Sequence, residues 1–197
     1  MRNALSKVFF VLVLAVLATG GVFAQEWYDS YAPGITDNKL FINAGSGFGP
    51  TGGFNMGLPP ISASVDFKLP ISLPITVGGI VVFTTWKYST SAGIPNSNID
   101  VTYMNFGFGG RGMYHFNFLK NLDAYAGATL GYVYQNASVR YGSAYDTIPK
   151  TSYTGAPFLL WGSNIGARYF FTNLIGVYLE LGYSGLHFAN TGVSLKF

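Results

Sequence analysis

Apolar and polar residues alternate along two runs that flank a short polar stretch, within residues 158–184. The odd positions of both runs are mostly apolar, and the even positions hold the small and charged residues. A period of two is typical of β-strands with two unlike faces. If residues 172–174 form a three-residue turn, Tyr169 pairs with Val177 and all apolar residues share one face. The pattern therefore predicts an antiparallel hairpin.

Aromatic residues stand at both ends of the apolar face of this hairpin. Trp161 and Tyr183 mark one end, and Tyr169 and Phe171 mark the other. Strands that cross a bilayer carry such aromatic girdles at the two membrane interfaces. We therefore expect both strands to span a membrane.

The same alternation recurs along the rest of the chain. It predicts six further strands, at residues 39–48, 61–69, 75–88, 100–116, 122–134 and 191–197. Short turns are expected at 70–74, 117–121 and 172–174, and longer loops at 49–60, 89–98, 137–157 and 185–190. Eight strands with alternating short and long connections predict an all-β fold, an eight-stranded antiparallel up-and-down transmembrane β-barrel. Both ends of the mature chain then lie on the periplasmic side.

The first 24 residues have the three parts of a secretory signal. Arg2 and Lys7 precede an apolar run at 8–18, and small residues end the segment at Ala24. We therefore expect a cleaved signal peptide at 1–24, followed by one barrel domain at 25–197.

Composition is consistent with a chain solvated by lipid. The sequence is 49% hydrophobic and 10% charged, and it contains 26 glycines and no cysteine. After the signal, no stretch reaches the length of apolar residues that a transmembrane helix needs. The absence of cysteine excludes disulfides and thiolate metal sites, and no basic cluster suggests nucleic-acid binding. A secreted soluble β-sandwich remains the alternative fold.

The residues resemble the small eight-stranded outer-membrane barrels, a family that includes the membrane domain of OmpA, OmpX and OmpW. The resemblance rests on the hairpin GARYFFTNLIGVYLELGYSG at 166–185 and on the final strand GVSLKF, which ends on Phe197. It implies residence in an outer membrane, surrounded by its lipid. It also implies that Phe197 is a signal read by the barrel-assembly machinery.

Charged residues gather on the face predicted to point inward. They are Asp66, Lys68, Arg111, Asp123, Arg168, Glu180 and Lys196. An eight-stranded barrel is only wide enough inside for side chains, so paired charges would plug the lumen. In the predicted register Glu180 lies diagonal to Arg168, its first expected partner, and Arg111 is the second.

Two classes of function stay open. The first is a non-enzymatic barrel with a plugged lumen, whose loops, chiefly 137–157, contact the environment, lipids or partner proteins. The second is an OmpW-like channel for small hydrophobic molecules, with a possible apolar mouth formed by Tyr103, Val133, Phe158 and Leu160. No cofactor, metal or catalytic site is expected.

An outer-membrane lipid-modifying enzyme is a further alternative. The segment 187–190 is similar to the His-x-Ser-Asn element of lipid A deacylases, but Ala189 stands where that element has its serine. Without a hydroxyl there is no nucleophile for His187 to activate.

Overall fold

The computed structural model describes residues 40–49, 55–91, 98–119, 121–142, 149–183 and 186–197. The predicted signal peptide at 1–24 lies outside these residues. Within the described part, no helix is long and apolar enough to cross a membrane.

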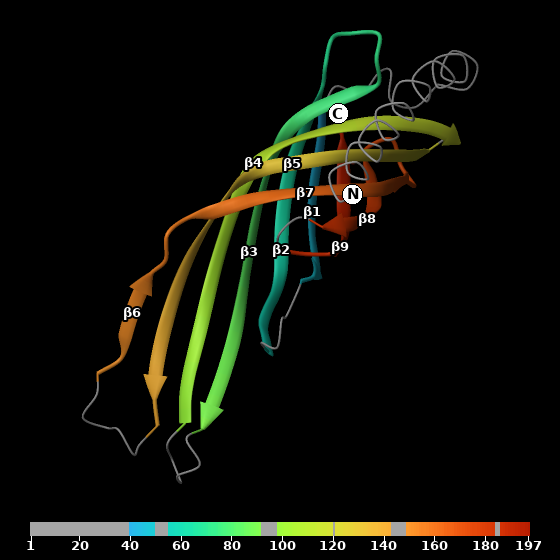
Figure 1. Cartoon of the computed structure of the whole chain (residues 1–197). Helices are drawn as coiled ribbons and strands as arrows, with labels where there is room; N and C mark the ends of the chain where they lie inside the picture. The colour runs from blue at the N-terminus through green and yellow to red at the C-terminus, as the bar shows by residue number, and fades with distance from the viewer. Residues whose placement is uncertain (1–39, 50–54, 92–97, 120, 143–148, 184–185) are drawn as a thin grey trace, which may run out of the picture.

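Nine β-strands make up most of the described chain. Their bounds are β1 Leu40–Phe48, β2 Asn55–Lys68, β3 Ile75–Ser91, β4 Asn98–Leu119, β5 Leu122–Tyr141, β6 Thr151–Thr154, β7 Phe158–Phe170, β8 Ile175–Tyr183 and β9 Ala189–Lys196. Eight of them form a closed antiparallel ring in the order β1, β2, β3, β4, β5, β7, β8, β9, with β9 paired back to β1 (Figure 1). The short β6 pairs with β5 beside the ring. The predicted eight-stranded barrel is confirmed, and a two-sheet sandwich is excluded.

The hairpin of β7 and β8 has the predicted register. Tyr169 faces Val177, and Ala167 faces Leu179. The turn is closed by Thr172, whose Oγ1 accepts hydrogen bonds from the backbone N–H groups of Leu174 at 3.2 Å and Ile175 at 2.8 Å. These bonds satisfy two backbone donors that a tight turn leaves without a strand partner.

The two faces of the barrel wall differ as the alternation predicts. On β3, Ile80 and Val82 are buried in the lumen, whereas Val81 and Phe83 are exposed on the outer wall. An apolar outer face with charged residues inside is the reverse of a soluble protein and suits a barrel with lipid around it.

Several strands are longer than predicted. β2 begins inside the predicted loop 49–60, and β4 continues into the predicted turn 117–121. The predicted loop 137–157 is partly wrong, because β5 runs to Tyr141 and β6 pairs with it. These segments are polar or irregular in pattern on both faces, so they carry no period-two signal, yet their backbone ladders continue.

The start of β2 is irregular because two prolines interrupt it. The register with β3 shifts on either side of Leu58, next to Pro59 and Pro60, which have no backbone N–H to donate. Side chains of β3 replace the missing ladder bonds: Leu58 N–H donates to Thr85 Oγ1 at 2.8 Å, and Thr84 Oγ1 donates to the Leu58 carbonyl at 2.9 Å. The first residues of β2, before the prolines, therefore remain paired with β3.

The barrel is much taller on one side than on the other. β3, β4 and β5 have 17, 22 and 20 residues, whereas β1, β8 and β9 have 9, 9 and 8. About 9–11 residues suffice for a tilted strand to cross a bilayer. Figure 1 shows the three long strands extending together past the rest of the ring, with β6 alongside. We call this part, residues 84–91, 98–105, 134–141 and 151–154, the projection.

Candidate functional site in the barrel lumen

Arg168 is the centre of a charged cluster in the lumen, and it is wholly buried. Its Nη2 lies 2.7 Å from Asp66 Oδ2, and its Nη1 lies 3.1 Å from Asp123 Oδ2. The rings of Phe41 and Tyr125 cover the guanidinium, with centroids 4.8 and 4.3 Å from Cζ. Arginine suits this place because its planar group pairs with carboxylates at its edge and stacks on aromatic rings.

Arg111 of β4 connects this cluster to Glu180 of β8. Its Nη2 donates to Glu180 Oε1 at 2.6 Å, and the Tyr125 hydroxyl donates to the same oxygen at 2.8 Å. Arg111 Nε lies 3.1 Å from Asp66 Oδ1 without hydrogen-bond geometry, so this contact is mainly electrostatic. The two arginines thus share Asp66 as a common partner.

The first expected partner of Glu180 was wrong and the second was right. Glu180 pairs with Arg111, while Arg168 turns toward Asp66 and Asp123. The expectation of Arg168 rests on the register of adjacent strands, whereas that of Arg111 rests on a shared inward face. In a narrow barrel a long side chain also reaches strands across the lumen, and there Arg168 finds two carboxylates.

Uncharged side chains extend the cluster to every strand of the ring. Asn43 of β1 donates to Asp66 Oδ2 at 3.2 Å and accepts from Ser194 of β9 at 2.8 Å. On the other side, His115 Nδ1 lies 2.8 Å from Asp123 Oδ1, and its Nε2 lies 2.9 Å from Thr76 Oγ1 of β3. Since a carboxylate only accepts, Nδ1 carries the proton in this contact. One connected network therefore links all eight strands of the ring.

Pairing is what makes so many buried charges tolerable. Three carboxylates and two guanidiniums lie together with side-chain exposures of 4% or less. An unpaired ion in such a place is strongly destabilising, whereas a well-bonded pair recovers most of its desolvation penalty. Each of these five charged groups thus has an oppositely charged partner within 3.1 Å, although Arg111 Nε and Arg168 Nε make no hydrogen bond of their own.

A glycine makes room for the tyrosine in this network. Gly166 of β7 lies between Tyr125 and Glu180 in the strand register. A Cβ at Gly166 would stand 2.5 Å from Tyr125 Cζ and 2.7 Å from its hydroxyl oxygen. The missing side chain lets the Tyr125 ring cross β7 and reach Glu180.

An apolar layer fills the lumen on the loop side of the charges. It consists of Ile80, Val82, Val133, Leu160 and Leu186, all buried. Leu186, which precedes β9, is wholly buried, so its side chain covers the lumen. Two predicted residues of the apolar mouth, Val133 and Leu160, lie inside this packed layer.

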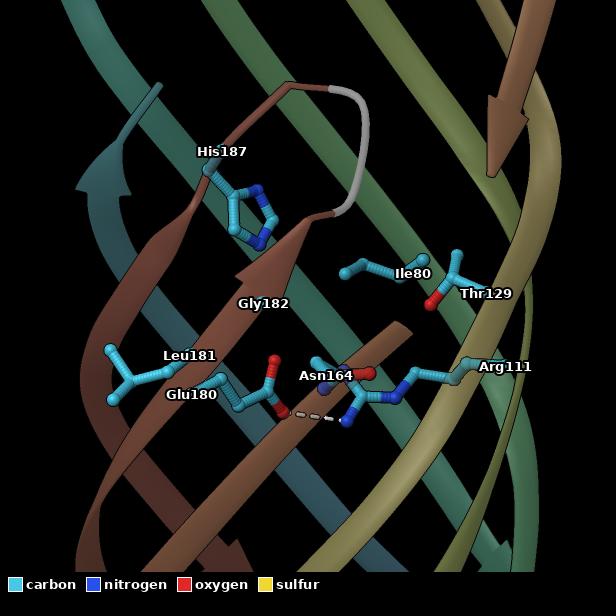
Figure 2. Close-up of a pocket in the computed structure, with 8 residues that line it drawn as sticks. All are labelled: Ile80, Arg111, Thr129, Asn164, Glu180, Leu181, Gly182 and His187. Atoms are coloured by element: carbon cyan, nitrogen blue, oxygen red, sulfur yellow. Dashed lines mark hydrogen bonds and ion pairs between the residues drawn. The ribbon is translucent and has the colours of Figure 1, made fainter. Parts of the chain in front are cut away.

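A small cavity of about 10 Å³ separates the two layers. Figure 2 shows the Arg111–Glu180 pair on one side of it and His187, from the β8–β9 connection, on the other. Burial lowers the pKa of His187 below its ordinary value; the negative Glu180 opposes this shift and the positive Arg111 adds to it. His187 therefore belongs to the closure of the lumen.

Most of the remaining predicted residues stand at strand ends. Lys196 stands over the Phe170 ring, with Nζ 4.4 Å from the centroid, and Lys68 is half-buried at the end of β2. Tyr103 is half-buried, and Phe158 is 40% exposed, opposite Val133. Phe197 is exposed, and its backbone exchanges two hydrogen bonds with Leu40 at the seam of the ring.

Sequence reasoning missed several members of the network. Asn43, Thr76 and Ser194 fall on the inward parity of their strands, but a short polar residue in a β-strand gives no sign of a partner across the lumen. Tyr125 also occupies an inward position. Gly166, which faces it on β7, is the sequence feature that indicates space for the ring to extend toward Glu180.

A closed ring of eight antiparallel strands, apolar outside and charged inside, is the fold of the small outer-membrane β-barrels. The resemblance predicted from the hairpin is therefore confirmed for the fold. No protein-family model matches the chain. No curated protein matches it.

Solved structures with a similar barrel include two of Ail, the attachment invasion locus protein of Yersinia pestis. The complex with the heparin analogue sucrose octasulfate matches with 12% identity and a TM-score of 0.47, over 81% of this chain and 94% of Ail. The β-barrel domain of Pseudomonas aeruginosa OprF matches with 15% identity and a TM-score of 0.38, over 81% of this chain and 98% of that domain. At these identities the similarity concerns the fold alone.

Proposed function

We propose that the protein is a non-enzymatic integral outer-membrane barrel whose lumen is closed by its own side chains. The observation that carries the proposal is the buried network that links all eight strands of the ring. The apolar layer around Leu186 is a second obstacle on the same axis.

The size of the barrel supports this proposal. Eight strands enclose an interior that side chains fill, and the cavity between the two layers holds about one water molecule. An ion would have to displace a charge from its partner to pass Arg111 and Glu180. The small cavity and the paired charges therefore favour a plugged barrel over the hydrophobic-molecule channel.

If the lumen is closed, the protein acts through contacts made by its outer surface. We assign the short turns, such as 172–174, to the periplasmic side and the projection to the outside, as is usual in outer-membrane barrels. The projection stands clear of the ring and presents polar side chains to surrounding lipids or partner proteins. The assembly role of Phe197 stays a prediction.

Catalysis has little support in the β8–β9 connection. His187 is buried and faces the Arg111–Glu180 pair across the small cavity. A histidine that activates a nucleophile needs a hydroxyl or thiol within hydrogen-bond reach, and Ala189 offers neither.

Solute uptake into proteoliposomes tests the proposal against the channel. The full chain is refolded into phosphatidylcholine vesicles, and entry of a small sugar and of a small apolar solute is followed separately. We expect both rates to match protein-free vesicles. Faster entry of the apolar solute alone would favour the channel, and faster entry of both would mean an open pore.

A further inference from the structure

A polar groove of about 390 Å³ lies on the projection, far from the lumen network. It is lined by Lys87, Tyr88, Ser89, Asp100, Val101, Thr102, Ser138, Arg140 and Lys150. The three long strands and the residue before β6 contribute to it, so the groove exists only because these strands extend beyond the ring.

The strand register arranges its polar residues in two rows. Ser89 faces Asp100 and Asp100 faces Arg140, and Lys150 continues this row because the next residue, Thr151, pairs with Val139. Lys87, Thr102, Ser138 and Ser152 form the second row. The residues of both rows occupy the alternate strand positions whose side chains point to the outside of the barrel.

The charges of the groove are unbalanced. Three cations, Lys87, Arg140 and Lys150, face one carboxylate, Asp100, which already accepts a hydrogen bond from Ser89 Oγ at 2.6 Å. Arg140 and Lys150, the residue before β6, stand next to each other in the first row, and like charges in such positions repel. A bound anion would remove this repulsion and use the hydroxyl groups of Ser138 and Thr102.

The groove continues the lipid-facing wall. Below it, the exposed aromatic residues Phe106, Phe108 and Tyr134 form the upper aromatic band, with Phe108 and Tyr134 stacked at 6.0 Å. Arg140 is six residues beyond Tyr134 on β5, about 20 Å along the strand and about 15 Å along the membrane normal after tilt. The headgroup layer of a phospholipid is only about 5–7 Å thick.

We propose that this groove binds the phosphorylated saccharide headgroup of a glycolipid in the surrounding outer leaflet. The proposal rests on the proposed function insofar as the barrel must lie in a membrane with the projection outside. Phosphates would pair with Arg140, Lys150 and Lys87, and sugar hydroxyls would bond to Thr102 and Ser138. The height of the groove above the aromatic band selects a large headgroup over that of a phospholipid.

Lipid retention tests the proposal. The full chain is refolded into phosphatidylcholine bilayers containing rough lipopolysaccharide and extracted in mild detergent, and the lipopolysaccharide retained per protein is counted by mass spectrometry. The test variant is Arg140→Gln with Lys150→Gln. Lys68→Gln is the matched control, since it removes a charge at the opposite end of the barrel. Heat-modifiable gel mobility verifies that each variant is folded.

We expect the double variant to retain about tenfold less lipopolysaccharide than wild type, and Lys68→Gln to retain the same amount. Lipopolysaccharide stripped of phosphate should be retained as poorly by wild type as by the double variant. Equal retention by wild type and double variant would overturn the proposal.

Soluble pyrophosphate distinguishes a free anion from a headgroup. If pyrophosphate in the millimolar range displaces the lipopolysaccharide completely, the groove is a general phosphate site and the lipid assignment is wrong; persistence of the lipid supports it. If the protein inserts and the vesicles stay impermeable, but wild type and double variant retain equal lipopolysaccharide, the glycolipid site is wrong and the proposed function stands. Failure to insert into bilayers refutes the proposed function.

Discussion

Removing Arg111 should destabilise the barrel more than removing its partner Glu180. In Arg111→Met, Glu180 loses its guanidinium partner and keeps the hydrogen bond from the Tyr125 hydroxyl, and Asp66 loses the nearby charge of Arg111 and keeps Arg168. A buried carboxylate without its cation costs about 3–5 kcal/mol. In Glu180→Gln, Arg111 retains Asp66 and the bond to Ser64 at 3.3 Å, so the expected loss is about 1–3 kcal/mol.

The two changes should not be additive. The double variant removes both charges of the pair and leaves no stranded Glu180, so we expect it to be more stable than Arg111→Met alone by about 1–3 kcal/mol. Urea titrations in phosphatidylcholine bilayers, followed by the fluorescence of lipid-facing Trp161, measure these differences. Arg140→Met is the control, because the same substitution at an exposed arginine should change the unfolding free energy by less than about 0.5 kcal/mol.

Additive losses would contradict this reasoning. If the double variant loses the sum of the two single losses, Arg111 and Glu180 do not act as a pair. If Arg111→Met is as stable as Arg140→Met, the lumen is hydrated enough to solvate a lone carboxylate, and the closed interior is wrong.

Three further predictions concern the packing of Tyr125, the lipid-facing wall and His187. Gly166→Val should displace the Tyr125 ring and lower stability by at least about 2 kcal/mol in the same titration, because its Cβ has no space; wild-type stability would refute the packing. Leu179→Arg, on the lipid-facing wall, should cost about 2–4 kcal/mol, and Ser152→Arg on the projection far less; equal costs would mean that the spanning region is misplaced. Because burial lowers the pKa of His187, the folded protein binds fewer protons there than the unfolded chain, so stability should fall as the pH drops below about 6.5. His187→Asn should weaken this pH dependence, and an unchanged slope would assign it to other groups.

The alternation of residues predicted the fold well because lipid and lumen impose opposite demands on successive positions. Tyr169 and Val177 occupy the register expected from turn length alone, since a shift by one residue would place charges in lipid. The strand pairing of residues 136–139 with 151–154 in the projection escaped prediction for the same reason. Around Ser138 and Ser152 both faces meet a polar environment, so no periodicity marks a strand there.

The sequence predicts which charged residues point into the lumen, but only part of how they pair. Parity along the strands placed Asp66, Asp123 and Arg168 on the inward face, and the structure brings them together. Their pairing depends on contacts across the barrel, which a strand register does not encode. Leu186 could not be predicted as a lumen residue because it lies in a connection, where neither parity nor pattern gives a direction.

Single-channel recording of the wild-type protein in planar bilayers tests the closed lumen most directly. With the network and the apolar layer in place, we expect a current baseline that matches the protein-free membrane, although the protein is folded and inserted. Regular stepwise openings from folded wild-type protein would contradict it, because ions would then pass a lumen in which Arg111 and Glu180 remain joined at 2.6 Å.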